Sequence, residues 1–313
     1  MANHKAHVLP VEQIVIGSGF EDSRLKPDQA IDFMRDKWAT ERATICAMEQ
    51  DTDGLDIDRL QDFATENGAP NLPIIALSPK NYAKATMLAY NEKGYATTDG
   101  KLAAEHGLIL ARRDPDLERT HGPKITEAVI AHEIGHAAAM PTVLARVDVE
   151  YKKQLFGGTN GRVSGKLTRL GFHEFPRDGA VTGHVFEEGY AERLRGKYVR
   201  EQLGMARGFS DLSVEPTPLD VHVTGRRDNQ DFLNGTYGAY LLGQMCEINA
   251  DLSDALRDAR ADISTKGNVV DIVDSFEPDM YDNLNKLHYY DDRDTYILTV
   301  ARAVSAVADF KKI

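Results

Sequence analysis

The chain of 313 residues has little cysteine: only Cys46 and Cys246, which stand far apart in the sequence. Two cysteines cannot build the disulfide framework of a small secreted domain, and they cannot hold a zinc ion by thiolates alone. The cysteine content therefore favours a reducing, cytoplasmic setting.

Long apolar runs are also missing. No stretch approaches the roughly 20 consecutive apolar residues that a transmembrane helix requires. The N-terminal residues lack the basic segment followed by an apolar one that is typical of a secretory signal. We therefore expect a cytoplasmic protein without a membrane partner.

Positive charge is in deficit, since the formal net charge is −12 at pH 7. A strongly acidic chain is repelled by phosphate backbones and by anionic lipid surfaces. This excludes nucleic acid as an expected partner. The composition gives no prediction of the oligomeric state.

What the sequence does contain is a mixed series of helices and strands. Helical spacing of apolar residues predicts helices at residues 27–42, 56–66, 182–199, 228–249, 253–263 and 294–310, with another from about Pro123 to just before Pro141. Short apolar runs predict strands at residues 44–48, 72–77 and 107–112. Residues 142–181 look irregular, with a polar, hairpin-like stretch at residues 162–175. Such a segment is typical of a lid, a substrate-selecting hairpin or an inhibitory plug. We expect an α+β fold in which residues 1–141 form an α/β subdomain, 142–181 an irregular insertion and 182–313 a mainly helical subdomain.

The pentapeptide His132-Glu133-Ile134-Gly135-His136 lies inside the predicted helix that ends before Pro141. Residues four apart share one face of a helix, so His132 and His136 can bind the same metal ion. Glu133 lies beside that ion, where it can take a proton from water. Two imidazoles on an apolar stripe are costly to bury without a partner. A metal ion is one such partner, and a pair of core histidines with other partners is the alternative.

A hydrolytic zinc ion needs three protein ligands and one open position. The segment Glu187-Glu188-Gly189-Tyr190-Ala191-Glu192 offers carboxylates on a later predicted helix. With the HExxH motif, it resembles the gluzincin metallopeptidases, the thermolysin-like group in which a Glu on a following helix completes the site. The resemblance implies a zincin-like core, Zn²⁺ as cofactor, and Glu188 as the third ligand with Glu187 as the alternate. Without a metal, the segment would be an ordinary helix with acidic residues near its start.

The same resemblance implies roles for neighbouring residues. Gluzincins use a Tyr or His to stabilise the oxyanion, and Tyr237 is the candidate, with Tyr240 second. Either tyrosine could instead be a core aromatic residue. Glu192 stands one turn after Glu188, where it can hydrogen-bond the remote nitrogen of a ligand histidine. His184, one turn before Glu188, could also reach the cleft, but a surface position in the first turn of the helix is the expectation.

The chain also departs from the family pattern. The interval from His136 to Glu188 is much longer than in thermolysin-type enzymes, and it contains residues 142–181. The GxMEN strand of the zinc aminopeptidases is missing before the motif, so aminopeptidase specificity is not expected. Gluzincins hold substrate as an extra strand along a sheet edge. Residues 107–112 are placed for this role, or they form a plain buried strand.

These observations predict a zinc-dependent metallopeptidase with its active-site cleft between the α/β and the helical subdomains. His132, His136 and Glu188 would bind Zn²⁺, Glu133 would act as general base, and Tyr237 would stabilise the oxyanion. The expected partner is a peptide or protein substrate. One alternative is a zinc-binding regulatory or interaction protein with little turnover, against which an intact Glu133 argues. The other is a metallohydrolase of non-peptide amides, whose chemistry at the carbonyl is the same.

Overall fold

The computed structural model describes residues 14–17, 26–90, 100–121, 124–149, 161–176, 181–203, 230–287 and 293–310. The chain forms two compact units: unit 1 comprises Met1–Ile130 and Pro141–Arg169, and unit 2 comprises Ala131–Met140 and Leu170–Ile313. The boundary falls inside helix α5 (Ile125–Ala137), so its last turns belong to unit 2. The HExxH motif and Glu188 were expected on different subdomains, whereas both belong to unit 2. Pro123, the expected start of this helix, lies outside the described residues.

Unit 1 contains a three-stranded sheet of β2 (Ile74–Leu77), β3 (Gly100–Ala103) and β4 (Leu108–Arg112). Strand β4 lies in the centre, parallel to β2 and antiparallel to β3. Both of its edges are therefore paired, and its residues 108–111 are fully buried. A strand without a free edge cannot accept a substrate strand. The substrate-binding role expected for residues 107–112 is thus wrong, and the alternative, a buried strand, is confirmed.

The second sheet of unit 1 is built on β5 (Pro141–Val149), which pairs in parallel with β1 (Ile14–Ile16) and also neighbours β6 (Gly161–Leu170). Val143 and Ala145 of β5 are fully buried, whereas Leu144 between them is partly exposed. This alternation is that of a strand with one buried face. The expectation of an irregular segment is therefore wrong for β5. Residues 162–175, which were expected to be hairpin-like, include strand β6.

Among the described residues, four α-helices lie wholly within unit 1. Helix α1 extends to Cys46, so the strand expected at residues 44–48 is wrong. Trp38, Arg42 and Ile45 are buried at helical spacing, and Ile45 packs in one cluster with Ile75 of β2. This packing outweighs the strand propensity of the β-branched residues at this position. The four helices are α1 (Pro27–Cys46), α2 (Ile57–Glu66), α3 (Pro79–Tyr90) and α4 (Pro115–His121).

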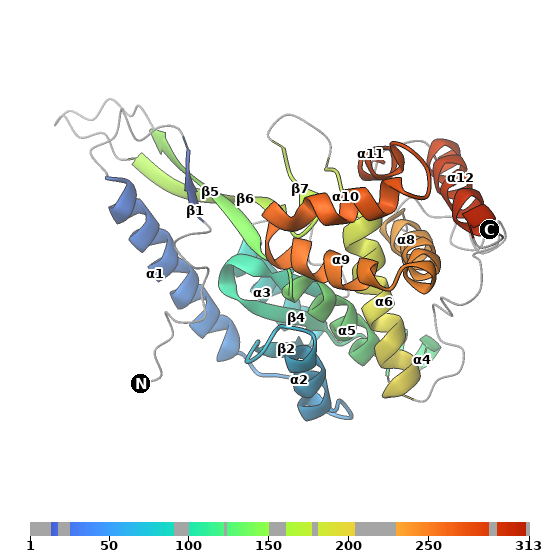
Figure 1. Ribbon diagram of the computed structural model, residues 1–313. Helices are drawn as coiled ribbons and strands as arrows, with labels where there is room; N and C mark the ends of the chain where they lie inside the picture. The colour runs from blue at the N-terminus through green and yellow to red at the C-terminus, as the bar shows by residue number, and fades with distance from the viewer. Residues whose placement is uncertain are drawn as a thin grey trace. The chain divides into compact units, whose positions relative to one another are not determined.

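Unit 2 is mainly helical. Two of its helices, α6 and α8, run beside each other and share a buried apolar cluster that includes Val185, Phe186 and Leu242 (Figure 1). The four helices expected after residue 181 are confirmed, with ends that differ by up to two residues. The elements that follow α5 in this unit are β7 (His173–Glu174), α6 (His184–Glu201), α8 (Gln230–Ile248), α9 (Asp251–Ala261), α10 (Lys266–Asp274), α11 (Met280–Asn285) and α12 (Arg293–Phe310).

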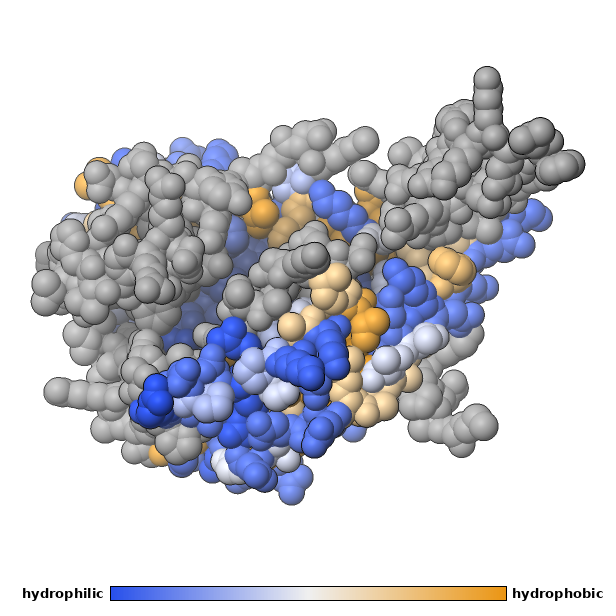
Figure 2. Space-filling model, turned by 180° about the vertical axis from the view of Figure 1, so that it is seen from behind, coloured by the Kyte–Doolittle hydropathy of each residue, from blue (hydrophilic) through white to orange (hydrophobic). Residues whose placement is uncertain are grey.

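The described surface in Figure 2 is mainly hydrophilic, with smaller hydrophobic areas. Large apolar side chains that are exposed include Phe33 of α1 and Leu298 of α12, so they come from separate elements. In the part of the chain that the structure describes, no helix combines the length and the apolar character needed to span a membrane.

Candidate metal centre

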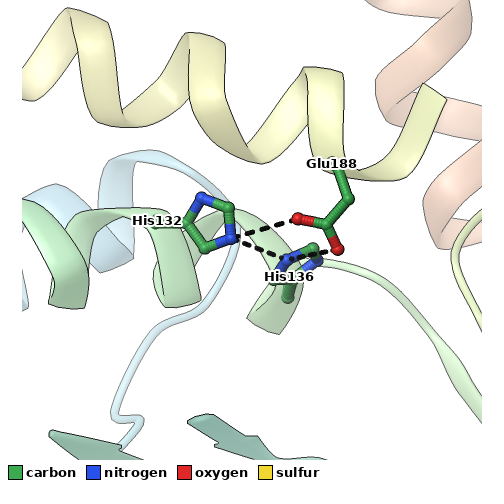
Figure 3. Close-up of side chains that lie close together, drawn as sticks. All are labelled: His132, His136 and Glu188. Carbon is green, nitrogen blue, oxygen red and sulfur yellow. Dashed lines mark hydrogen bonds and ion pairs between the residues drawn. The ribbon is translucent and has the colours of Figure 1, made fainter. Parts of the chain in front are cut away.

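Three side chains of unit 2 point toward one another: His132 and His136 from α5, and Glu188 from α6 (Figure 3). The Nε2 atoms of the two histidines are 3.1 Å apart. Glu188 Oε2 lies 3.3 Å from His132 Nε2, and Oε1 lies 3.5 Å from His136 Nε2. The structure thus brings together the three residues that the sequence analysis expected as ligands. Their role in metal binding stays a prediction.

These separations fit one small metal ion. Ligand atoms about 2.0–2.1 Å from a tetrahedral centre lie about 3.3–3.4 Å from one another. The two Nε2 atoms are 3.1 Å apart, and the nearest Glu188 oxygen lies 3.3 Å from His132 Nε2 (Oε2) and 3.5 Å from His136 Nε2 (Oε1), so each pair is close to that value. The side chains of His132 and Glu188 are 18% and 14% exposed, so water can reach the site. The donor set of two imidazoles and one carboxylate is that of several catalytic zinc sites.

Glu187 hydrogen-bonds His136 at the ring nitrogen that faces away from Glu188. The Nδ1 atom of His136 lies 3.0 Å from Glu187 Oε1. Glu187 is fully buried, and it also accepts hydrogen bonds from Arg260 Nη2, at 2.6 Å, and from the Phe172 backbone N–H, at 3.1 Å. Burial alone would raise the pKa of Glu187, but the Arg260 charge and the His136 bond hold it well below its usual range. An ionised Glu187 accepts a hydrogen bond from the Nδ1–H group of His136, which leaves the Nε2 lone pair of His136 for a metal.

Arg260, the partner of Glu187, is a charged residue inside the core of unit 2. Its side chain is 1% exposed, and its guanidinium lies 4.0 Å above the ring of Tyr190. It also donates to the backbone carbonyl of Gly135, inside the HExxH motif. Arg260 therefore connects α9 to both motif helices, because it contacts α5 through Gly135 and α6 through Glu187.

His132 has a corresponding contact. Its Nδ1 atom lies 3.0 Å from Glu192 Oε1, and Glu192 Oε2 lies 2.7 Å from Arg195 Nη2. Glu192 therefore lies at ion-pair distance from the remote nitrogen of His132, and the hydrogen bond that the sequence analysis expected there stays a prediction. Each histidine of the motif thus has one carboxylate at Nδ1, and Glu188 at Nε2.

The charges of these groups favour a cation. Burial lowers the pKa of both motif histidines, but the carboxylates outweigh it: the pKa of His136 rises to about 9, and that of His132 rises well above its ordinary value. Burial would raise the pKa of Glu188, yet His136 and His132 hold it well below its usual range. Glu188 is therefore ionised at neutral pH. A metal cation that binds here takes the place of protons on the two Nε2 atoms.

Two glycines bring the motif helices close together. A Cβ atom on Gly135 of α5 would lie 2.6 Å from the Cα of Ala191 on α6. A Cβ atom on Gly189 of α6 would lie 2.7 Å from the carbonyl carbon of Gly238 on α8. The Gly and Ala after Glu188 therefore have a packing role: they let α6 approach its two neighbours.

Glu133, the expected general base, lies on α5 between the two histidines and is partly exposed. Tyr237 belongs to α8, but its side chain lies outside the described part of the structure. Tyr240 is half-buried on the same helix. The roles of these three residues stay predictions.

The expectation that His184 is a surface residue is wrong. It is 8% exposed, and its ring lies 4.5 Å from that of His173, which is 6% exposed. His173 Nε2 lies 3.6 Å from Glu188 Oε1. Burial lowers the pKa of His173 to about 3, against the attraction of Glu188, so this ring is neutral at pH 7.

The sequence analysis missed His173 and Arg260, as well as the bond from Glu187 to His136. Arg260 had a usable signal: Leu252, Leu256 and Arg260 are four residues apart and all buried on α9, so a charge stands on an apolar stripe and needs a buried counter-ion. His173 had no such signal, since it follows a turn in a segment without a clear pattern.

No protein-family model matches this sequence, and no curated protein matches it either. The resemblance to gluzincins thus rests on the two short motifs that meet at the candidate metal centre.

Proposed function

We propose that this protein is a zinc-dependent metallopeptidase. The observation that carries the proposal is the convergence of His132 Nε2 and His136 Nε2 of α5 with Glu188 of α6, at separations of 3.1–3.5 Å. Glu133 lies on the same helix as the two histidines. Two imidazoles and a carboxylate match the ligand preference of Zn²⁺ among the common cations, because Mg²⁺ and Ca²⁺ favour sites built from oxygen atoms.

In this proposal His132, His136 and Glu188 hold the ion. A zinc ion bound there supplies Lewis acidity, which lowers the pKa of water and polarises a substrate carbonyl. Glu133 accepts a proton from the attacking water and passes it to the leaving amine. Glu187 and Glu192 hold the two imidazoles in place through their Nδ1 atoms. Tyr237 is proposed as the donor that stabilises the oxyanion.

The test compares wild type with Glu133→Gln, which removes the base but not a ligand. We expect both proteins to carry about one tightly bound Zn²⁺ per chain, and only wild type to cleave members of a diverse peptide library. The loss in turnover should be at least about 100-fold, the usual contribution of a general base. Glu201→Gln, at an exposed carboxylate on α6, serves as the matched control and should cleave like wild type.

Other outcomes favour other functions. Metal binding without cleavage by either protein would support a regulatory zinc protein. Cleavage of small amides but not of peptides would support a non-peptide amidohydrolase. Absence of tightly bound metal from wild type would falsify the whole proposal.

A further inference from the structure

Glu188 faces a second pair of histidines besides those of the HExxH motif. His173 lies on β7, and His184 is the first residue of α6. One ligand atom from each of His173, His184 and Glu188 can be chosen so that all three lie within 4.8 Å of one another. The two imidazole rings meet edge to face, with centroids 4.5 Å apart and planes at 69°. Both side chains are more than nine-tenths buried.

His173 is the polar group in this pair that lacks a partner at one nitrogen. Its Nε2 atom is inaccessible to solvent and makes no hydrogen bond within the described residues. The nearest carboxylate oxygen, Glu188 Oε1, lies at 3.6 Å, which is beyond hydrogen-bonding distance. A buried polar atom without a partner is destabilising, and a cation would satisfy the Nε2 lone pair.

The backbone holds these two histidines together. Glu174 and Thr182 exchange two backbone hydrogen bonds of 3.2 Å, which fold the chain back before α6 begins. Gly183 follows with a φ of 81°, a conformation that favours glycine, and a Cβ at this position would collide with the carbonyl of Phe172. The turn therefore requires glycine next to His184, and it places His184 beside His173.

We propose that His173, His184 and Glu188 hold a second divalent metal ion, so that the Glu188 carboxylate bridges it to the ion at His132 and His136. This inference rests on the proposed function, because it assumes an ion at the first site. The carboxylate of Glu188 lies near histidines of both sites: Oε2 is 3.3 Å from His132 Nε2, and Oε1 is 3.5 Å from His136 Nε2 and 3.6 Å from His173 Nε2. Hydrolases with two metal ions hold them about 3.5–4 Å apart, a spacing that one bridging carboxylate can span.

The two ions are not equivalent. The second site offers two imidazoles and a share of a carboxylate that the first ion also uses, and the first ion repels the second. We therefore expect the second ion to bind at least about tenfold more weakly than the first. In two-metal hydrolases the pair of ions stabilises both the attacking and the leaving oxygen. A second ion here would give the peptidase that additional Lewis acid.

The experiment is a titration of the chelator-treated, full-length protein with Zn²⁺, followed by calorimetry and by metal analysis after gel filtration. Wild type should bind two ions per chain in two steps. His173→Gln and His184→Gln should each keep the tight step and lose the weak one. His106→Gln, at a buried histidine of unit 1 that bonds Glu41, is the control and should keep both steps.

A second measurement keeps the proposal testable if the variants do not fold. Wild type loaded with two equivalents of Co²⁺ should show magnetic coupling between the ions in its electron paramagnetic resonance spectrum, because one carboxylate bridges them. A single step with one ion, unchanged by His173→Gln, would overturn the second site and leave the proposed function intact. A single ion that is lost in His173→Gln would also overturn it, since His173 would then serve the first site. Binding of no ion would overturn both.

Discussion

Glu187 and Glu188 occupy consecutive positions of α6, and a helix turns by about 100° per residue, so their carboxylates have different partners. Glu188 faces the Nε2 atoms of both motif histidines. Glu187 instead bonds Nδ1 of His136 and the guanidinium of Arg260. The position of Glu188 suits a ligand, whereas that of Glu187 suits a residue that orients a ligand.

Replacing each carboxylate by an amide should separate these roles. Glu188→Gln removes the charged ligand and should lower the affinity for Zn²⁺ by more than about 100-fold, the upper end of what an orienting residue contributes. Glu187→Gln should lower that affinity by only about 10–100-fold. Calorimetric titration with Zn²⁺ measures both. If Glu187→Gln loses the ion while Glu188→Gln retains it, the assignment of the third ligand is reversed.

Arg260 is a buried charge whose removal leaves another charge uncompensated. Arg260→Met should reduce the free energy of unfolding of the metal-free protein by about 3–5 kcal/mol, because Glu187 stays buried without its cation. Arg257→Met is the matched control on the same helix: its side chain is 62% exposed, and the change should be within about 0.5 kcal/mol. Denaturant unfolding gives both values. The double variant Arg260→Met with Glu187→Gln should recover part of the loss. Equal stability of Arg260→Met and Arg257→Met would argue against a structural role for the pair of Arg260 and Glu187.

At the scale of elements, the candidate site depends on how closely α5, α6 and α8 approach. The glycines of the two motifs are the contact points: Gly135 meets Ala191, and Gly189 meets Gly238. The ligand separations are set by the same approach, because His132 and His136 lie on one helix and Glu188 on the other. A change in helix spacing must therefore change the geometry of the metal site.

Gly135→Ala tests this dependence. The added methyl group would overlap α6, so we expect a loss of about 1–3 kcal/mol in the free energy of unfolding, together with weaker Zn²⁺ binding. Gly243→Ala in α8 meets no atom within 4 Å, and it should instead stabilise the protein by about 0.5–1 kcal/mol through helix propensity. Thermal unfolding and metal titration of both variants are the measurements. A Gly135→Ala protein with the stability and affinity of wild type would show that this contact does not set the site.

The helices of unit 2 could be predicted because their apolar residues recur at helical spacing over many turns. The short strands and their pairing could be predicted less accurately from the sequence. Ile45 favours a strand by propensity, but its packing against the β2–β4 sheet keeps it in α1. The central position of β4 depends on pairing with β3, which lies before it in the chain and has no strong pattern of its own. Strand pairing is a long-range property, and a single segment does not encode its edges.

The convergence of the three candidate ligands could be predicted because each belongs to a short motif on a helix, where spacing fixes the direction of the side chains. The residues that support them could not all be found in this way. Arg260 stands 73 positions after Glu187, and His173 comes from a turn before α6, so only the folded chain brings them to the site. Two segments of sequence therefore predict the candidate ligands, whereas the residues that surround these ligands are brought to the site only by the fold of unit 2.

At the scale of the whole molecule, each unit has its own buried apolar clusters. Those of unit 1 include Trp38 with Val143, and Ile75 with Leu110, whereas the cluster of unit 2 includes Phe186 with Leu242. The three proposed ligands of the first metal ion all belong to unit 2. An ion that binds the native unit and not its unfolded form stabilises that unit by about 2.7 kcal/mol when its free concentration is 100 times the dissociation constant.

Zinc should therefore slow amide hydrogen exchange unevenly along the chain. Amides of α6 and α9, which exchange when unit 2 opens, should slow by up to about 100-fold at that zinc concentration, while those of β2 and β4 in unit 1 should change far less. Hydrogen exchange followed by mass spectrometry, with and without Zn²⁺, makes the comparison within one sample. Glu188→Gln is the control, because it keeps the helices but removes a ligand, and its exchange should not respond to zinc. Equal slowing in both units would mean that they open together. No slowing in wild type would mean that the native protein does not bind Zn²⁺.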